Sequence, residues 1–331
     1  MDEVGIFRKL AKTKENLKDL SREEAYLFLK AILEREISKI KSSAFFTAMR
    51  IKGETVEELL GFYEALQEKM LIKDSNSVDC LDVATNYDGK VRSPYILPSA
   101  IFIAIANGIK ITFHGEDCIP VKEGITLHRI FKEMGIKISK NMAFKYLEKC
   151  GVSYILQKDF IPDLYAILPL RRELGFRTFL NVLEKLLNPF NSKRIITSVF
   201  HKPYLERTAE LLRFLGFERW AVVRGLEGGI EPYTDRETEI LTPEGPLKVK
   251  CKIGKIPEVN LSPRAQAELN LKVLKGEEKG FFKDWAIYAG AILLFAYGKV
   301  KNFQEALEIS RDTLETKRAY IYLQNCKQIN K

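Results

Sequence analysis

The sequence predicts an α/β fold, with a small N-terminal helical domain and a larger α/β domain that has a mainly parallel central sheet. Residues 1–72 follow helical periodicity throughout, and no strand pattern interrupts them. Residues 78–113 and 194–224 then each show a strand, a helix and a second strand in that order. This order is typical of βαβ units, in which the two strands lie parallel.

In the helical part, Ser21 and Glu24 have the spacing of a capping box, which predicts that a helix starts there. Residues 53–55 break the helical pattern, and residues 56–70 resume it as a second amphipathic helix. We therefore expect residues 1–75 to form a helical domain.

The α/β part begins with a short strand at 78–83, followed by a turn and by an apolar helix at 98–107 that ends at Gly108. Beyond these elements we expect strands at 109–113, 154–156, 194–199, 220–224 and 243–255, and helices at 127–134, 163–187, 204–215, 263–275 and 284–325. Residues 243–255 alternate apolar and charged side chains, which is typical of a half-exposed antiparallel strand.

The helices near 163–190 are expected to pack back onto residues 1–75 and to complete the helical domain. The α/β domain then comprises residues 76–162 and 191–331. A ligand cleft is expected between the two domains, at the carboxyl ends of the strands.

Composition indicates a globular protein and excludes several classes. Of the 331 residues, 46% are hydrophobic and 29% are charged. No apolar run reaches the roughly 18 residues of a membrane span, and residues 285–297 are too few, so we expect no membrane partner. The charged N-terminus lacks the apolar core of a signal peptide, which favours a cytoplasmic protein.

The five cysteines are odd in number, widely scattered and without a CxxC pair, and there are only three histidines. This pattern argues against a disulfide framework and against a zinc site. It favours a reducing, cytoplasmic location.

The net charge of +9 is unevenly distributed: residues 161–224 carry 11 basic and 6 acidic side chains. A basic patch of this kind attracts phosphates or nucleic acid, although a solvated lysine-rich surface is an equally good interpretation. The residues we assign to a nucleic-acid contact are Lys137, Lys140, Lys145, Lys149, Lys193 and Arg194.

Residues 82–89 lie where a strand should feed a phosphate-binding loop into a helix. Backbone N–H groups at such a helix start bind anions, and glycines allow the phosphate to approach closely. The segment reads D-V-A-T-N-Y-D-G and has only Gly89, so it lacks the glycines that such a loop needs.

This segment resembles the D-V-x-G-T-G-G-D-G loop of the anthranilate phosphoribosyltransferase family, which shares its fold with pyrimidine nucleoside phosphorylases. Thr85, Asp88 and Gly89 match that loop, and Ala84, Asn86 and Tyr87 stand at its glycine positions. The resemblance continues at His114-Gly115 (K-H-G-N), at residues 171–181 (R-R-E-L-G-x-R-T-x-x-N) and at residues 187–189 (L-x-N-P). It spans nearly the whole chain, and it implies the helical and α/β domains of that family.

The active-site motifs of the family are altered together. Residues 95–98 replace N-I-S-T, Phe113 replaces the lysine before His114, and residues 119–123 replace a serine-rich stretch. Glu116 and Asp117 follow His114-Gly115, and beside phosphoribosyl diphosphate each would cost about 4 kcal/mol of repulsion at roughly 4 Å. Together these changes argue against ordinary phosphoribosyl transfer.

The resemblance implies a Mg²⁺ ion if the protein is a transferase, and no cofactor if it only binds nucleic acid. Of the acidic pair that holds the metal in the family, one carboxylate is lost here; Glu231 falls at the pair, and Glu227 is nearby but offset. In the family an arginine at Arg171 or Arg172 faces the aromatic acid substrate, and either could instead contact a polyanion.

Two functions follow, and a relative of the family with a different phosphate-bearing ligand is a third, less favoured alternative. The first is a protein that binds single-stranded DNA or RNA, in a groove that could continue across a homodimer, because residues 86–90 (N-Y-D-G-K) resemble the Asn-x-x-Gly-Lys/Arg loop of a nucleic-acid-binding branch of the family. The second is a Mg²⁺-dependent phosphoribosyltransferase acting on anthranilate, in tryptophan biosynthesis, or on a related aromatic amine. The loop residues we assign to phosphate or ligand are Thr85, Asn86, Tyr87, Asp88, Gly89, Lys90, Arg92, His114 and Gly115. Tyr87, Lys90 and Arg92 are expected to be presented for base stacking and phosphate contact.

Overall fold

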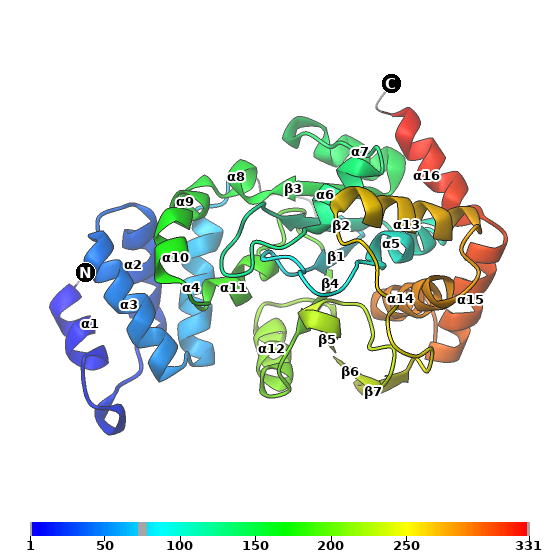
Figure 1. The fold of residues 1–331 in the computed structure, drawn as a ribbon. Coiled ribbons are helices and arrows are strands. Elements are labelled where there is room, and N and C mark those ends of the chain that lie inside the picture. Colours follow the sequence, from blue (N-terminus) through cyan, green and yellow to red (C-terminus); the bar gives the residue numbers. More distant parts are fainter. Residues whose placement is uncertain (1, 72–77, 330–331) are drawn as a thin grey trace.

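A computed structural model describes residues 2–71 and 78–329 of the chain. It has an N-terminal helical domain and an α/β domain with a seven-stranded, mostly parallel sheet, as the sequence predicts. In Figure 1 the N-terminal helices form one end of the molecule, and the C-terminal helices form the other.

The helices of the first domain and its flanking segments are α1 (Glu3–Leu10), α2 (Arg22–Leu33), α3 (Lys39–Lys52), α4 (Val56–Glu68), α8 (Gln157–Phe160), α9 (Pro162–Ala166), α10 (Leu168–Leu174) and α11 (Leu180–Leu183). The helices of the α/β domain are α5 (Leu97–Ala106), α6 (Leu127–Glu133), α7 (Ala143–Cys150), α12 (Pro203–Phe214), α13 (Pro263–Lys275), α14 (Phe281–Tyr297), α15 (Phe303–Glu315) and α16 (Arg318–Gln328). The strands are β1 (Leu81–Ala84), β2 (Ile111–Gly115), β3 (Val152–Leu156), β4 (Arg194–Val199), β5 (Arg219–Arg224), β6 (Glu237–Thr242) and β7 (Gly245–Lys250). Short 3₁₀ turns lie at Lys14–Asn16, Lys140–Met142, Glu184–Leu186 and Leu226–Gly228.

Local capping fixes the starts of the N-terminal helices. The predicted capping box of Ser21 and Glu24 is present at the start of α2, and Thr55 and Glu58 form a second one at α4. Each box satisfies backbone N–H groups that the first helical turn leaves unpaired. The predicted break at residues 53–55 is therefore the point where α3 ends and a capped helix begins.

A phenylalanine cluster joins the N-terminal helices to the segment that follows β3. Phe28 and Phe45 lie 4.3 Å apart between ring centroids, and Phe62 stacks on Phe179 at 4.0 Å. Phe179 belongs to the segment between α10 and α11, and it is only 2% exposed. Residues from far along the chain thus share one apolar core with α2, α3 and α4.

The strand order β3-β2-β1-β4-β5-β6-β7 places β1 at the point where the order reverses. The five strands β1 to β5 are parallel to one another, and β6 and β7 add an antiparallel hairpin at one edge of the sheet. In open α/β sheets, ligands bind beyond the carboxyl ends of the strands at such a switch point. The loops after β1 and β4 are therefore the ones that shape the site.

The apolar run near residue 290 forms the buried helix α14, and the Trp285 indole donates to the Pro232 carbonyl at 3.0 Å. Within residues 2–71 and 78–329, no helix is long and apolar enough to cross a membrane.

The sequence argues against a disulfide framework, and one disulfide bond is present among the described residues. Cys150, at the end of α7, is bonded to Cys326 in α16, with 5.0 Å between their Cα atoms. The sequence could not show this pair because 176 residues separate the two cysteines. The bond fastens the C-terminal helix to α7, and Cys80, Cys118 and Cys251 stay free.

Candidate functional site

A cavity of about 290 Å³ lies between the helical domain and the carboxyl ends of β1 and β4. Five segments supply its walls: Arg50 and Glu54 at the end of α3, residues 86–92 after β1, residues 177–186, residues 197–204, and the turn at residues 227–228, with Lys122 added from the loop after β2. These segments meet only in the folded chain. The cavity therefore lies where the strand topology predicts a ligand cleft.

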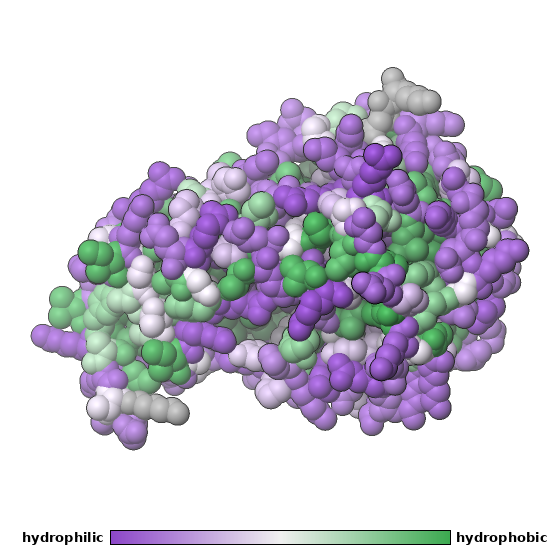
Figure 2. Space-filling model, in the orientation of Figure 1, coloured by the Kyte–Doolittle hydropathy of each residue, from purple (hydrophilic) through white to green (hydrophobic). Residues whose placement is uncertain are grey.

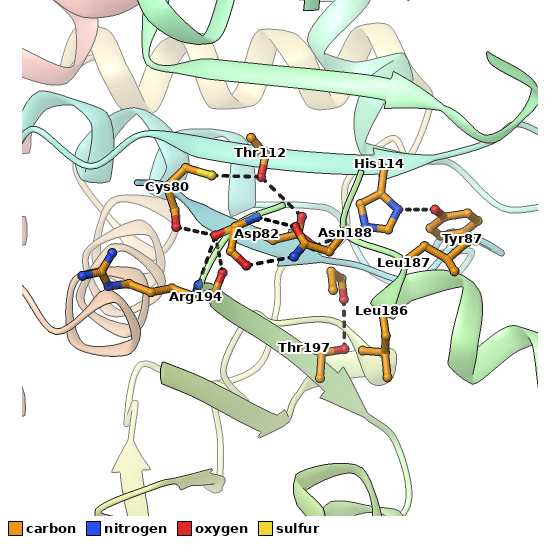
Figure 3. A network of polar contacts seen from close by, with 12 residues as sticks. Cys80, Asp82, Tyr87, Thr112, His114, Leu186, Leu187, Asn188, Arg194 and Thr197 are labelled. Carbon is orange, nitrogen blue, oxygen red and sulfur yellow. Dashed lines mark hydrogen bonds and ion pairs between the residues drawn. The ribbon is translucent and has the colours of Figure 1, made fainter. Parts of the chain in front are cut away.

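Tyr87 is not presented for stacking, contrary to the prediction. Its side chain is 2% exposed, and its hydroxyl group is hydrogen-bonded to Nδ1 of His114 (Figure 3). The ring packs with Ile119 and Leu168 on the floor of the cavity. Burial raises the pKa of the Tyr87 hydroxyl well above its usual value, with nearby carboxylates acting in the same direction. Tyr87 thus fills space that a glycine at this position would leave open.

Behind Tyr87, a chain of polar groups crosses the sheet (Figure 3). His114 Nε2 lies 3.3 Å from Asp82 Oδ2, and Thr112 donates to Asp82 Oδ1 at 3.4 Å. Asp82 and His114 are almost fully buried. The imidazole is therefore held between a carboxylate and a phenol, which agrees with a structural role for His114.

Lys90 is also not presented to solvent, so that expectation is wrong as well. Its ammonium group lies 2.7 Å from Glu231 Oε2, and both side chains are fully buried. The Tyr95 ring covers it, with 4.4 Å between Nζ and the ring centroid. Burial lowers the pKa of Lys90, and Glu231 opposes that shift. The positive charge of Lys90 is thus neutralised inside the fold.

The two carboxylates predicted to hold Mg²⁺ do not fit a metal ion here. Glu227 accepts hydrogen bonds from the backbone N–H groups of Val91 and Arg92 at 2.9 and 3.1 Å, and from the Ser93 hydroxyl. Glu231 is enclosed with the Lys90 ammonium, which occupies the place of a cation. Among the described residues there is no group of three or more His, Cys, Asp or Glu side chains that could bind a metal. An Mg²⁺ site would need free, convergent oxygen ligands, which these residues do not supply.

The remaining loop residues have backbone or paired roles. Asn86 lines the cavity and donates to the Glu227 carbonyl at 3.1 Å, and Arg92 is exposed at the cavity wall. Gly89 has φ +68°, and a Cβ there would lie 2.5 Å from the Ile125 carbonyl oxygen, so only glycine fits. Thr85 and Gly115 continue the ends of β1 and β2.

The structure separates the two arginines that the sequence leaves open. Arg171 is buried and makes two hydrogen bonds to Glu184, at 2.7 and 3.0 Å. Arg172 is half-exposed and pairs with Glu123 at 2.7 Å. Neither arginine is part of the cavity wall, whereas Glu184 is. Arg171 therefore acts through Glu184, which it holds in place.

The expected repulsion from Glu116 and Asp117 is wrong, because both carboxylates have partners of their own. Glu116 accepts from the backbone N–H of Lys158 at 3.0 Å and is 2% exposed. Asp117 lies 2.8 Å from His128 and 2.6 Å from Arg129, which lower the pKa of its carboxyl group. Neither residue belongs to the cavity wall.

Of the residues assigned to nucleic acid, two are already paired. Lys193 lies 2.6 Å from Glu218, and Arg194 pairs with Asp79 and stacks over Tyr297. The other four, on and before α7, are exposed, and no ion pair of the described residues involves them; they are Lys137, Lys140, Lys145 and Lys149. None of the six lines the cavity.

Four cations of the cavity were missed as site residues: Arg50, Lys122, Arg177 and Lys185. Arg177 donates to Asp88 Oδ2 at 3.0 Å, and Lys185 is buried and donates to the Ser198 carbonyl at 2.7 Å. Arg177 lies inside the matched R-R-E-L-G-x-R-T motif, and Lys122 lies in the altered serine-rich stretch. Their positions in these motifs could have identified Arg177 and Lys122 as site residues, whereas nothing in the sequence distinguishes Lys185 from an ordinary helix residue.

Two family models match the chain. The helical bundle domain of the glycosyl transferase family matches residues 5–70, and the a/b domain of that family matches residues 95–320. An uncharacterized protein of Aquifex aeolicus (strain VF5) is 43% identical over 307 residues, covering 91% of this chain and 95% of that protein. The anthranilate phosphoribosyltransferase of Geobacillus sp. (strain WCH70) is 28% identical over 313 residues, covering 91% of each.

Solved structures give the same picture. The anthranilate phosphoribosyltransferase from Thermus thermophilus has a TM-score of 0.82 at 25% identity, and covers 99% of both chains. The enzyme of Saccharomyces cerevisiae in complex with PRPP and Mg has a TM-score of 0.80 at 18% identity, covering 98% of this chain and 97% of that one. At that identity the second comparison shows a shared fold.

Proposed function

The chain belongs to the glycosyl transferase family with a helical bundle and an α/β domain, and from this premise we propose that it lacks ordinary phosphoribosyl transfer and binds single-stranded nucleic acid. Two buried side chains support the loss of transfer. The Lys90 ammonium pairs with Glu231, and Tyr87 fills the loop where glycines would let phosphate approach. The fold is kept while the groups that hold a metal and a diphosphate are altered.

One observation carries the nucleic-acid part: four exposed lysines on and before α7 have no ion pair with any residue that the structure describes, and we call them the lysine face (Lys137, Lys140, Lys145 and Lys149). Lys145 and Lys149 are four residues apart on one helix, so they lie on the same side of it. Figure 2 shows that hydrophilic side chains are spread over most of the visible surface of the molecule. Exposed lysines without carboxylate partners suit phosphate contacts along a flexible strand.

The test is a fluorescence anisotropy titration with single-stranded oligo-dT and oligo-U over a series of salt concentrations. Binding should weaken steeply with salt, by a slope in log–log form of roughly 0.7 for each phosphate contact. Replacing Lys145 and Lys149 together by glutamine should reduce that slope by roughly 1.4. Lys193→Gln is the matched control, because Glu218 already pairs with that lysine. Absence of binding at low salt would remove the proposal.

The alternative function is phosphoribosyl transfer to anthranilate or another aromatic amine with Mg²⁺, as the names of the similar enzymes suggest. It is favoured by similarity along the whole chain. Purified protein incubated with anthranilate, phosphoribosyl diphosphate and Mg²⁺ should give no product above the blank. Formation of phosphoribosyl anthranilate would instead support a transferase.

A homodimer is the assembly we expect, through the outer face of α3. Ile40 and Ile51 are 83% and 67% exposed, and eleven residues of helix bring them within about 20° of each other. Val4, at 61% exposure, lies beside them because Glu3 pairs with Lys41. Ile40→Asp should therefore shift the mass measured by light scattering from dimer to monomer, and Phe214→Asp, at an exposed site on α12, should not.

A cytoplasmic location stays a prediction, and the Cys150–Cys326 bond is the observation against it.

A further inference from the structure

The wall of the cavity carries more positive than negative charge. Its cations are Arg50, Arg92, Lys122, Arg177 and Lys185, and its carboxylates are Glu54, Asp88, Glu184 and Glu227. Two of these carboxylates are paired with arginines from outside the wall: Arg171 lies 2.7 Å from Glu184, and Arg207 lies 3.7 Å from Glu54. Counting those two arginines, seven cations face four carboxylates, which leaves an excess of three positive charges.

Two of the cations in the wall, Arg177 and Lys122, lie next to Asp88. Arg177 donates to its Oδ2 from Nε at 3.0 Å and also from Nη2 at 2.5 Å. The Lys122 ammonium lies 3.8 Å from Asp88 Oδ1 and 3.6 Å from Glu227 Oε1, and it donates to the Gly89 carbonyl at 3.1 Å. One buried carboxylate thus orients two cations of the wall.

Lys185 is the third cation of this cluster, and it is the most buried. Only 9% of the residue is exposed, and its ammonium group donates to one acceptor among the described residues, the Ser198 carbonyl. Burial lowers the pKa of Lys185 to about 8; Asp88 and Glu184 oppose this shift, and Arg177 and Lys122 add to it. An ammonium group has three N–H donors, so Lys185 has donors to offer a ligand in the cavity.

We propose that Lys122, Arg177 and Lys185 form a metal-independent binding site for a phosphate monoester, with a nucleoside monophosphate as the ligand class. These three cations belong to a wall with an excess of three positive charges, and a phosphate monoester carries about −1.5 to −2 at neutral pH. Asp88 accepts from the Nε and Nη2 groups of Arg177, so Arg177 offers a ligand its remaining N–H donors and its charge, and the two lysines add point charges that suit phosphate oxygens. The charge match needs no divalent cation, in agreement with the enclosed Lys90–Glu231 pair.

The size and lining of the cavity favour a single nucleotide. Its volume of about 290 Å³ is at the lower end of the roughly 300–1,000 Å³ of small-molecule sites. Phe179, Phe200 and Tyr204 line the same cavity and offer apolar surface to a base or sugar. A sugar diphosphate together with a separate aromatic acid would need more room and more positive charge.

The test is isothermal titration calorimetry of the whole protein with uridine 5′-monophosphate, uridine and inorganic phosphate in excess EDTA. Uridine monophosphate should bind more tightly than inorganic phosphate, and uridine should bind at least tenfold more weakly than its monophosphate. Lys122→Gln, a change at a partly exposed side chain that leaves the core intact, should weaken nucleotide binding at least tenfold. Lys185→Met should do the same.

The matched control is Lys149→Gln on the lysine face, which should leave nucleotide binding unchanged while it weakens oligonucleotide binding. Conversely, Lys122→Gln should leave oligonucleotide binding unchanged. The two proposals thus fail separately, because they rest on different residues. Binding of uridine as tight as that of its monophosphate, a requirement for Mg²⁺, or an unaffected Lys122→Gln would each overturn the cavity proposal.

Discussion

Lys90 and Lys185 are both buried lysines near the carboxyl ends of the sheet, yet their surroundings differ. Lys90 has a carboxylate at 2.7 Å and an aromatic ring over it, and it takes no part in the cavity wall. Lys185 has one backbone carbonyl as hydrogen-bond acceptor, the carboxylates of Asp88 and Glu184 and two cations as neighbours, and the cavity in front of it. A buried charge is costly unless it is paired. The charge of the first lysine is paired directly with a carboxylate inside the fold, whereas the second has no carboxylate in direct contact and lies beside an open volume, as in a binding site.

The largest expected change in stability comes from removing the carboxylate that pairs with Lys90. Glu231→Ala leaves the Lys90 ammonium buried without a carboxylate, so the free energy of unfolding should fall by about 3–5 kcal/mol. Urea denaturation at neutral pH measures it. The double variant Lys90→Met, Glu231→Leu is the control, since well-packed apolar residues often replace a buried pair without loss. A Glu231→Ala protein as stable as the unchanged chain would show that the pair contributes nothing.

For Lys185 we expect the opposite change: replacing it should increase the free energy of unfolding. Lys185→Met removes a charge whose burial is only partly offset, so it should raise the free energy of unfolding by about 1–3 kcal/mol, after the loss of the bond to Ser198. The same denaturation experiment measures this gain. A variant that is more stable and yet no longer binds nucleotide is the signature of a residue kept for its ligand. Lost stability would mean that Lys185 is structural.

The pH dependence of stability sharpens the same point. Lys185 has a pKa of about 8 in the folded protein and about 10.5 when unfolded, so the unfolded chain binds more protons between those values. The cost of the buried charge is fully present below pH 8 and is removed as the pH rises. Relative to Lys185→Met, the unchanged protein should therefore gain up to about 1.4 kcal/mol per pH unit between pH 8 and 10.

The charged groups around Lys185 set the limits of this pH experiment. They are Asp88, Glu184, Arg177 and Lys122. Above about pH 10 the buried tyrosines Tyr87 and Tyr95, whose pKa values are raised, pull stability in the other direction. A difference between the two proteins that does not change from pH 7 to 10 would contradict the inferred environment.

Much of the fold was predictable because it follows local patterns. The β-branched run of β4 and the capped start of α2 lie where their periodicity and capping residues put them. Strand β6 was missed, because Glu237–Thr242 has few apolar residues and pairs mainly through its hairpin with β7. Local patterning thus determines most elements, and pairing determines the exceptions.

The site was predictable in place but not in orientation. The strand order puts a ligand cleft beyond β1, and the cavity is there. Tyr87 and Lys90 point inward because their partners, His114 and Glu231, come from other strands and loops. The role of Lys185 depends in the same way on Ser198 and on the cavity, so spacing along the chain could not reveal it.

The smallest expected effect comes from a buried polar group without charge. Tyr87→Phe keeps the ring that fills the loop and removes only the hydrogen bond to His114. The free energy of unfolding should fall by about 0.5–1.5 kcal/mol, the usual net value of one hydrogen bond, well below the effect of Glu231→Ala. Tyr165→Phe, at a 39% exposed site, is the control and should stay within about 0.5 kcal/mol. An equal loss of unfolding free energy in Tyr87→Phe and Glu231→Ala would contradict this expectation. Burial of any polar group near the loop would then explain both results, and the contrast between a paired and an available charge would no longer be needed.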